Sequence, residues 1–151
     1  MKLFSIMPVR VLDYSDTNNP DNVEEMSRVA ISIEKDDVEQ YLKPFLERYF
    51  DCELEANNYR VDYAQDEETG EMKFVNVVGF QWYRANNFYT LGAVECILED
   101  IRKTVDAIKA KASRAEPALI TEFYESFIIK MENMIKAAEE EGFDLISFEG
   151  P

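Results

Sequence analysis

The spacing of apolar residues predicts two strands at the start of the chain. Residues 2–14 are rich in Leu, Phe, Ile and Val, which predicts the first strand. Pro8 lies within it, and because proline cannot donate a hydrogen bond to a neighbouring strand, it indicates an edge position or a bulge. Residues 28–34 alternate between apolar and polar side chains and predict the second strand. The turn formers at 16–22 predict an exposed loop between the two.

A helical period begins after the second strand. Apolar side chains recur every three or four residues from Val38 to Phe50, which predicts a helix with one face packed on a sheet. Asp36 and Glu39 have the spacing of a capping box, so we expect the helix to begin there. Pro44 removes one helical hydrogen bond, which predicts a kink or two consecutive short helices.

A β-hairpin is predicted in the middle of the chain. Residues 59–63 alternate, the acidic stretch 66–70 has the composition of a turn, and apolar residues return from Met72 to Trp82. Both faces of this second hairpin strand are apolar. We therefore expect part of it to be central in a sheet and covered on both sides.

Two long amphipathic helices are predicted in the last third. Apolar stripes follow residues 91–108 and 119–138 at helical spacing. Thr90 is placed to cap the first helix, Pro117 to open the second, and Gly142 to follow its end. We expect the two helices to form an antiparallel pair.

The order of these elements indicates the fold class. Residues 143–148 add a short last strand, giving the order ββαββααβ. This order predicts an α+β fold in which a mostly antiparallel sheet of about five strands packs against three amphipathic helices. No repeat or linker interrupts the pattern, so residues 1–151 are expected to form a single domain.

Composition then narrows the class of partner. The chain is 46% hydrophobic and 13% aromatic, which is typical of a globular protein, yet 31 Asp and Glu against 16 Lys and Arg give a net charge of −15. A field of this sign repels phosphate backbones, so we expect no direct binding to nucleic acid. It favours a partner protein with a basic surface.

Missing residue types exclude much enzyme chemistry. There is no His, which removes Ser–His and Cys–His dyads and His-containing zinc or haem sites. Cys52 and Cys96 are not in a CxxC pair; Cys96 is expected to be buried in the helical stripe and Cys52 more exposed. The acidic loop at 13–21 does not match a calcium-binding loop. We therefore expect no metal, no cofactor and no catalytic residue, and an enzyme is the less favoured reading.

The sequence also leads to an expectation about location. Residues 1–10 lack the features of a signal peptide, and no window approaches about 20 apolar residues, the length of a membrane span. We therefore expect a cytoplasmic protein with reduced thiols and no membrane contact.

Two groups of residues are candidates for partner binding. The first is acidic and surrounds the hairpin turn: Asp62, Asp66, Glu67 and Glu68. The second lies in the aromatic stretch 79–89, where Tyr83, Arg84 and Tyr89 have the side chains that dominate interface energetics. Phe80 and Trp82 in the same stretch are expected to be core. The plain alternative is an acidic surface that keeps the protein dispersed and has no specific partner.

Three functional hypotheses follow. The leading one is a non-enzymatic acidic protein-binding module, such as an inhibitor or immunity-type protein that masks a basic nucleic-acid-handling partner, with mimicry of nucleic acid as a special case. The alternative is a small-ligand-binding or carboxylate-dependent enzymatic domain, with a pocket between sheet and helices lined by tyrosines such as Tyr41, Tyr49, Tyr59 and Tyr63. The third is a homo-oligomer that associates through the last helix.

Overall fold

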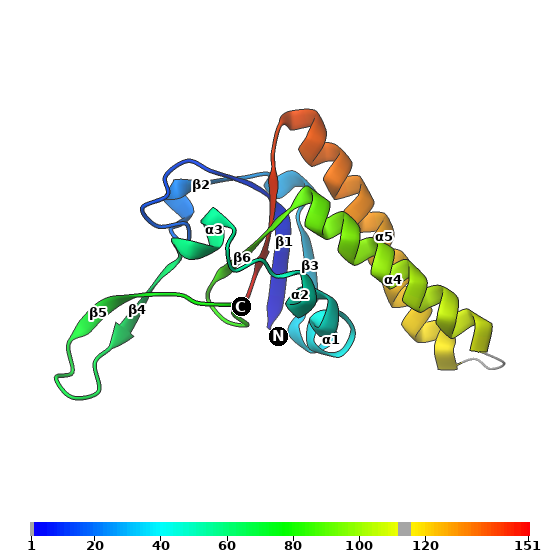
Figure 1. The fold of residues 1–151 in the computed structure, drawn as a ribbon, viewed down its shortest axis with the longest axis horizontal. Helices are drawn as coiled ribbons and strands as arrows, with labels where there is room; N and C mark the ends of the chain where they lie inside the picture. The colour runs from blue at the N-terminus through cyan, green and yellow to red at the C-terminus, as the bar shows by residue number, and fades with distance from the viewer. Residues whose placement is uncertain (1, 112–115) are drawn as a thin grey trace.

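The fold is α+β, as the sequence predicts (Figure 1). The computed structural model describes residues 2–111 and 116–151. A five-stranded, mostly antiparallel sheet has the order β2–β1–β7–β6, with β3 also paired to β1. Its strands are β1 (Leu3–Val11), β2 (Val23–Glu25), β3 (Ile31–Glu34), β6 (Asn86–Thr90) and β7 (Leu145–Glu149).

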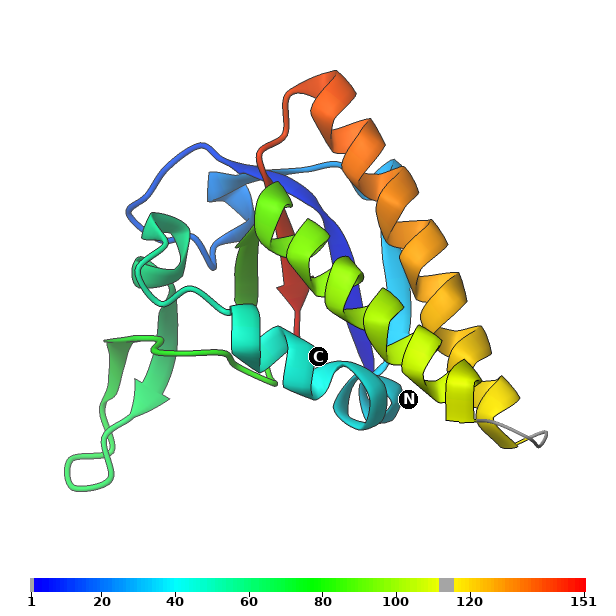
Figure 2. The ribbon, with the colours of Figure 1, turned by 45° about the vertical axis from the view of Figure 1, so that its right-hand side comes forward.

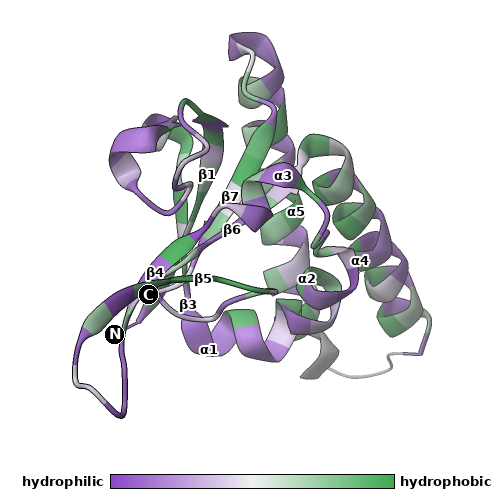
Figure 3. Ribbon diagram, turned by 60° about the vertical axis from the view of Figure 1, so that its left-hand side comes forward, coloured by the Kyte–Doolittle hydropathy of each residue, from purple (hydrophilic) through white to green (hydrophobic). Residues whose placement is uncertain are grey.

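One face of the sheet is covered by helices (Figure 2). The long helices α4 (Leu91–Lys111) and α5 (Glu116–Glu141) pack as an antiparallel pair across it, which confirms that prediction. The opposite face is partly covered by the short helix α3 (Glu55–Asn58), which the sequence pattern did not predict. The central strands β1 and β7 are largely hydrophobic in Figure 3, as expected of strands between two layers.

The main core lies between the sheet and the helix pair. It contains completely buried side chains from β1, β7 and α4, among them Phe4, Phe148 and Ile101. Phe80 and Trp82 pack against this core, as expected, and the ring of Trp82 meets Phe4 edge to face at 5.6 Å between centroids. Burial of this apolar surface is the main source of stability.

Pro8 does not place β1 at an edge, which corrects the prediction. Strand β1 pairs with β7 on one side and with both β3 and β2 on the other. In a strand, the N–H and C=O of one residue point to the same neighbour, and the Pro8 carbonyl accepts from Met26 N at 2.9 Å. The missing N–H therefore faces the short gap between β3 and β2, where it interrupts no strand ladder.

The predicted strand at 28–34 and the helix after it are each partly correct. Only Ile31–Glu34 is a strand, because Ser27–Val29 forms a 3-10 turn. The helix begins at Lys35 after Glu34, without a side-chain cap, so the predicted Asp36 capping box is wrong. A π-helical segment, Val38–Leu42, divides α1 (Lys35–Asp37) from α2 (Lys43–Tyr49).

Pro44 explains this division. It lies in the first turn of α2, where its missing N–H costs least. The wider π turn just before it is closed by the Lys43 N–H, which donates to the Val38 carbonyl. The predicted interruption at Pro44 is therefore confirmed.

The ends of the long helices also agree with the sequence. The Thr90 Oγ1 accepts from Ala93 N at 3.1 Å and caps α4. Gly142 has a φ of +77°, and Phe143 N after it donates to the Ala138 carbonyl at 2.8 Å, which ends α5. The break predicted around Ser113 lies outside the described residues. No described helix has the length and apolar character needed to cross a membrane.

The predicted hairpin forms, but its predicted place in the sheet is wrong. Strands β4 (Val61–Gln65) and β5 (Met72–Asn76) make a separate two-stranded sheet that projects from the body (Figure 1). Far from being covered on both faces, its second strand leaves Phe74 exposed by 74% and is followed by Val78, exposed by 78%. At Gly79, where φ is +72°, the chain turns back toward the core.

The carboxyl of Glu149, on the last residue of β7, provides a test of the sheet's electrostatics. The Glu149 side chain is exposed, but partial desolvation of its carboxyl raises the pKa above its usual range, and the Glu25 carboxylate raises it further. A raised pKa in the folded protein means that ionisation costs stability, and this cost is absent below the usual pKa of about 4. We expect Glu149→Gln to raise the free energy of unfolding at pH 7 and to leave it unchanged at pH 4, as measured by urea denaturation.

The matched control for this prediction is Glu140, an exposed residue on α5. Glu140→Gln should leave the free energy of unfolding unchanged at both pH values. Equal effects of the two substitutions at pH 7 would contradict a cost of ionisation specific to Glu149.

Candidate protein-binding hairpin

The hairpin is attached to the body by a buried arginine at its base. Arg60, directly before β4, has no solvent exposure. Its Nε donates to the Asn57 carbonyl at 3.0 Å, its Nη1 to the Asn86 carbonyl at 3.0 Å and Asn87 Oδ1 at 3.2 Å, and its Nη2 to the Gly79 carbonyl at 2.6 Å. One side chain therefore joins the incoming strand, the outgoing loop and β6.

The electrostatic environment of Arg60 is unusual for such an acidic protein. All its described hydrogen-bond acceptors are amide oxygens, and no described carboxylate forms an ion pair with it. Burial therefore lowers the pKa of Arg60 to about 10, which still leaves the guanidinium charged at pH 7. The guanidinium carbon lies 5.3 Å from the centre of the Phe50 ring, so its flat face also has an aromatic neighbour.

Side-chain amides complete the attachment. Asn57 on α3 is 2% exposed; its Nδ2 donates to the Phe88 carbonyl and its Oδ1 accepts from Phe88 N, both at 2.9 Å. Asn18, in the loop before β2, accepts from Asn86 N at 2.9 Å. Strand β6 is the last strand of its sheet, and these groups satisfy the backbone on its outer edge.

The predicted acidic residues gather on the hairpin, with two different roles. Asp66 organises the turn: its Oδ1 accepts from Glu68 N at 2.8 Å and Thr69 N at 3.2 Å, and its Oδ2 lies 3.1 Å from Lys73 Nζ. These hydrogen bonds, first those from the backbone, lower the pKa of Asp66. Asp62, Glu67 and Glu68 are exposed; Asp62 Oδ1 accepts from Tyr63 N at 2.7 Å, but no described cation forms an ion pair with any of the three carboxylates.

One face of the hairpin is apolar, which the sequence reading missed. Tyr63 and Phe74 lie opposite each other in the ladder, with ring centres 4.7 Å apart. They are exposed by 52% and 74%, and Met72 beside them by 48%. The exposed aromatic pair beside acidic side chains combines the two features that favour a protein interface.

The aromatic stretch contributes less than expected. Tyr89 is 1% exposed and its hydroxyl donates to the Leu46 carbonyl at 2.6 Å, so its predicted availability to a partner is wrong. Desolvation in this core position raises its pKa. A residue in the middle of a strand that faces the helix layer is core, whatever its side chain could do at a surface.

Tyr83 and Arg84 are exposed but lie away from the acidic cluster. The Tyr83 ring has Lys2 Nζ and Lys35 Nζ within 5.2 Å and 4.9 Å of its centre, so it lies beside the start of β1. Arg84 has a φ of +53°, and its backbone N–H donates to the Pro151 carbonyl at 3.2 Å. The structure therefore brings together the acidic candidates but not these two.

The tyrosines of the small-ligand hypothesis do not converge. Tyr41 packs on Phe123 of α5, whereas the Tyr49 hydroxyl donates to Asp100 of α4. Tyr59 contacts Tyr14 in the first loop, and Tyr63 lies on the hairpin. Their contacts place them in different parts of the molecule.

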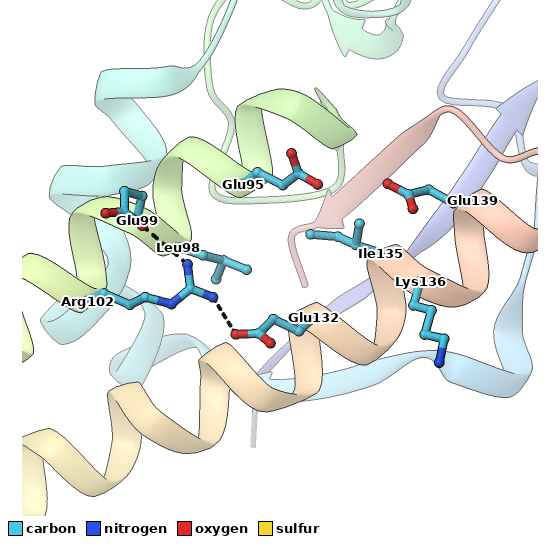
Figure 4. A pocket seen from close by; sticks show the side chains of 8 residues that line it. All are labelled: Glu95, Leu98, Glu99, Arg102, Glu132, Ile135, Lys136 and Glu139. Carbon is cyan, nitrogen blue, oxygen red and sulfur yellow. Dashed lines mark hydrogen bonds and ion pairs between the residues drawn. The ribbon is translucent and has the colours of Figure 1, made fainter.

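A groove of about 450 Å³ between α4 and α5 is the other candidate site (Figure 4). Arg102 projects across it and forms ion pairs with Glu99 of its own helix and Glu132 of the facing helix. Arg102 thus links α4 to α5, which is a structural role. Within residues 2–111 and 116–151, no group of three acidic or cysteine side chains has the arrangement of a metal site.

The cysteines add no site. Cys52 is exposed, as expected, but Cys96 is also exposed, which corrects the prediction that it is buried. It precedes the buried Ile97 on α4, and one step along a helix turns the side chain by about 100° away from the core.

The signals that sequence reasoning overlooked were present in the hairpin. The sequence pattern places the apolar residues Met72, Phe74 and Val78 in a covered strand because apolar residues are usually buried, yet all three are exposed. Nothing in the sequence around Arg60 indicates that its side chain is buried. Comparison with protein family models, curated proteins and solved structures finds no match to this chain, so a function has to be inferred from the residues themselves.

Proposed function

We propose that this chain is a non-enzymatic protein-binding module whose hairpin contacts a partner protein with a basic surface. The observation that carries the proposal is the exposed Tyr63–Phe74 pair on a projecting hairpin whose residues 61–76 hold five acidic side chains and one lysine. An aromatic centre with charged surroundings is the usual anatomy of an interface. The charges would accelerate association and select the partner.

Within this proposal, the partner class is a protein that handles nucleic acid. Such proteins carry Lys and Arg where phosphates bind, and carboxylates on a rigid projection could occupy those positions. The chain would then act as an inhibitor or immunity-type protein and would itself bind no nucleic acid. Its two exposed, unpaired cysteines fit a reducing compartment such as the cytoplasm.

The test is binding to the partner recovered by affinity capture at low salt from cells that make the protein. The combined variant Asp62→Asn, Glu67→Gln, Glu68→Gln removes three exposed charges and keeps Asp66, which the turn needs. We expect it to weaken binding by at least about tenfold at low salt and to flatten the dependence of affinity on ionic strength. Titration calorimetry at two salt concentrations measures both.

The matched control removes three exposed charges elsewhere. The variant Glu122→Gln, Glu139→Gln, Glu140→Gln changes the net charge equally but acts on α5. If both triple variants weaken binding equally, overall charge is responsible and the hairpin is not the site. An affinity that salt does not change would contradict the role of charge altogether.

Mimicry of nucleic acid can be tested separately from protein binding. A partner that handles nucleic acid should release a labelled oligonucleotide when wild-type protein is added, and the hairpin variant should need at least about tenfold more protein. Simultaneous binding of oligonucleotide and wild-type protein would overturn mimicry while leaving the protein-binding proposal in place.

A further inference from the structure

The hydrogen bonds of the hairpin show which of its backbone groups point outward. Val77 N donates to the Arg60 carbonyl, and Asp66 N to the Glu71 carbonyl. Bonded pairs in an antiparallel ladder occur at every second position, so the residues between these two pairs alternate in a known order. Every second residue of each strand therefore has its N–H and C=O directed away from the hairpin: 61, 63 and 65 on β4, and 72, 74 and 76 on β5.

The outer edge of β4 is partly occupied. Val61 N donates to Asp16 Oδ1 at 3.1 Å, and Asn18 Nδ2 donates to the Val61 carbonyl at 3.2 Å. Tyr63 N donates to the Asp62 carboxylate at 2.7 Å. Loop and side-chain groups thus satisfy much of this edge.

The outer edge of β5 is different. In the part of the chain that the structure describes, no hydrogen bond engages the outward N–H or C=O groups of Met72, Phe74 and Asn76. The edge of the main sheet at β6 is covered by Asn57, Arg60 and Asn18, whereas the only described strand that pairs with β5 on the projecting hairpin is β4 (Figure 1). An open edge next to exposed apolar side chains is a template for another strand.

We propose that β5 binds an extended segment of the partner protein, which pairs with the outward backbone groups of Met72, Phe74 and Asn76. This inference rests on the proposed function and specifies how the same surface recognises its partner. Backbone hydrogen bonds would supply affinity, and alternate apolar side chains of the segment would cover the Tyr63–Phe74 pair. Lysine or arginine at the end of the segment beside the turn would meet the turn carboxylates, while Lys73, on the other face of β5, is already paired with Asp66 at 3.1 Å.

Charge favours a different protein over a second copy of this chain. Residues 61–76 have a net charge of −4, from five acidic residues and Lys73. Pairing two copies edge to edge would bring two such hairpins together, which costs energy, whereas a basic segment gains it. The occupant is therefore a basic, alternating segment of another protein.

The probe for this proposal is a synthetic seven-residue peptide, Lys-Val-Lys-Val-Lys-Val-Lys, with blocked ends. Two proline variants of the full-length protein separate the two edges. Asn76→Pro removes one outward N–H from β5, and Gln65→Pro removes one from β4; neither N–H belongs to the hairpin ladder. Loss of one hydrogen bond should weaken peptide binding by about fivefold in Asn76→Pro and by less than about twofold in Gln65→Pro.

Amide hydrogen exchange of wild-type protein gives an independent readout. The amides of Met72, Phe74 and Asn76 should exchange fast in free protein and at least about tenfold more slowly with saturating peptide. Equal binding by both proline variants together with unprotected amides overturns strand pairing. Protection of these amides in concentrated protein without peptide, with self-association in light scattering, also overturns it, because the occupant is then a second copy.

Different results would contradict binding through the hairpin acids and strand pairing at β5. Suppose that peptide binding depends on salt and that the acidic triple variant no longer binds the peptide, but that the β5 amides stay unprotected. Binding through the charged surface is then supported, and strand pairing is contradicted. If the triple variant binds the peptide as well as wild type does, the proposed function of the hairpin acids fails, whatever the amides show.

Discussion

Arg60→Met is expected to lower the free energy of unfolding by about 3–5 kcal/mol. The substitution keeps an unbranched side chain of similar length but removes every donor. The carbonyls of Asn57, Asn86 and Gly79, together with Asn87 Oδ1, then lose their bonds to Arg60. A buried acceptor without a partner costs about 1–3 kcal/mol, and relaxation of the loop recovers part of the sum.

Two further variants give this prediction its controls. Arg60→Lys keeps the charge but cannot reproduce the fork of donors, so its effect should lie between those of wild type and Arg60→Met. Arg48→Met removes an exposed arginine that pairs with Asp100 at 3.2 Å and should cost less than about 1 kcal/mol. Urea denaturation measures all three. A loss below about 1 kcal/mol in Arg60→Met would show that its hydrogen bonds do not hold the fold.

The same substitution should also loosen the hairpin. Arg60 links its base to β6 and to the loop at Gly79. Amides in the ladder between β4 and β5 should therefore exchange faster in Arg60→Met, relative to those of α4, than they do in wild type. Unchanged relative exchange would mean that the hairpin is held by other contacts.

The parts of the fold that sequence predicted are those governed by local chemistry. The stripe from 91 to 108 repeats over five turns, and Thr90 and Gly142 have the conformational preferences that helix ends require. Pro44 divided a helix as expected, because a missing N–H acts at its own position. These features need no knowledge of distant residues.

The predictions that failed depended on distant residues. Pro8 is tolerated in a central strand because its missing N–H faces the gap between β3 and β2, on the side where its carbonyl accepts from Met26, 18 positions later in the chain. The sequence does not predict strand β6, because Asn86 and Asn87 favour turns. In the structure, the Asn87 side chain is buried and bonds Arg60, Gln81 and Phe148, so tertiary contacts override its local preference.

The same distinction applies to the candidate site. Sequence identified Asp62, Asp66, Glu67 and Glu68 because a turn gathers its own neighbours. The sequence could not show that β5 lies outside the main sheet, so its apolar pattern places Phe74 in the interior. Tyr89 failed for the opposite reason: its chemistry suits an interface, but its strand lies beneath the helices.

Asn57→Leu should leave the backbone of Phe88, on the edge of β6, without its hydrogen-bond partners. Its amide makes two hydrogen bonds to the backbone of Phe88 and one to the Asp51 carbonyl at 3.0 Å. Leucine has nearly the same shape but no polar atom, so it leaves buried groups on β6 and before α3 without partners. We expect the free energy of unfolding to fall by about 2–4 kcal/mol.

The neighbouring residue provides a matched control. Asn58 is exposed, and Asn58→Leu on the same helix should change the free energy of unfolding by less than about 0.5 kcal/mol. Urea denaturation compares the two variants, and light scattering detects association through the bared edge. We expect Asn57→Leu, but not Asn58→Leu, to associate as concentration rises, because an unprotected edge strand pairs with other strands. Equal stability of the two variants would show that the Asn57 amide is dispensable; a less stable but monomeric Asn57→Leu would show that it stabilises the fold without protecting the edge.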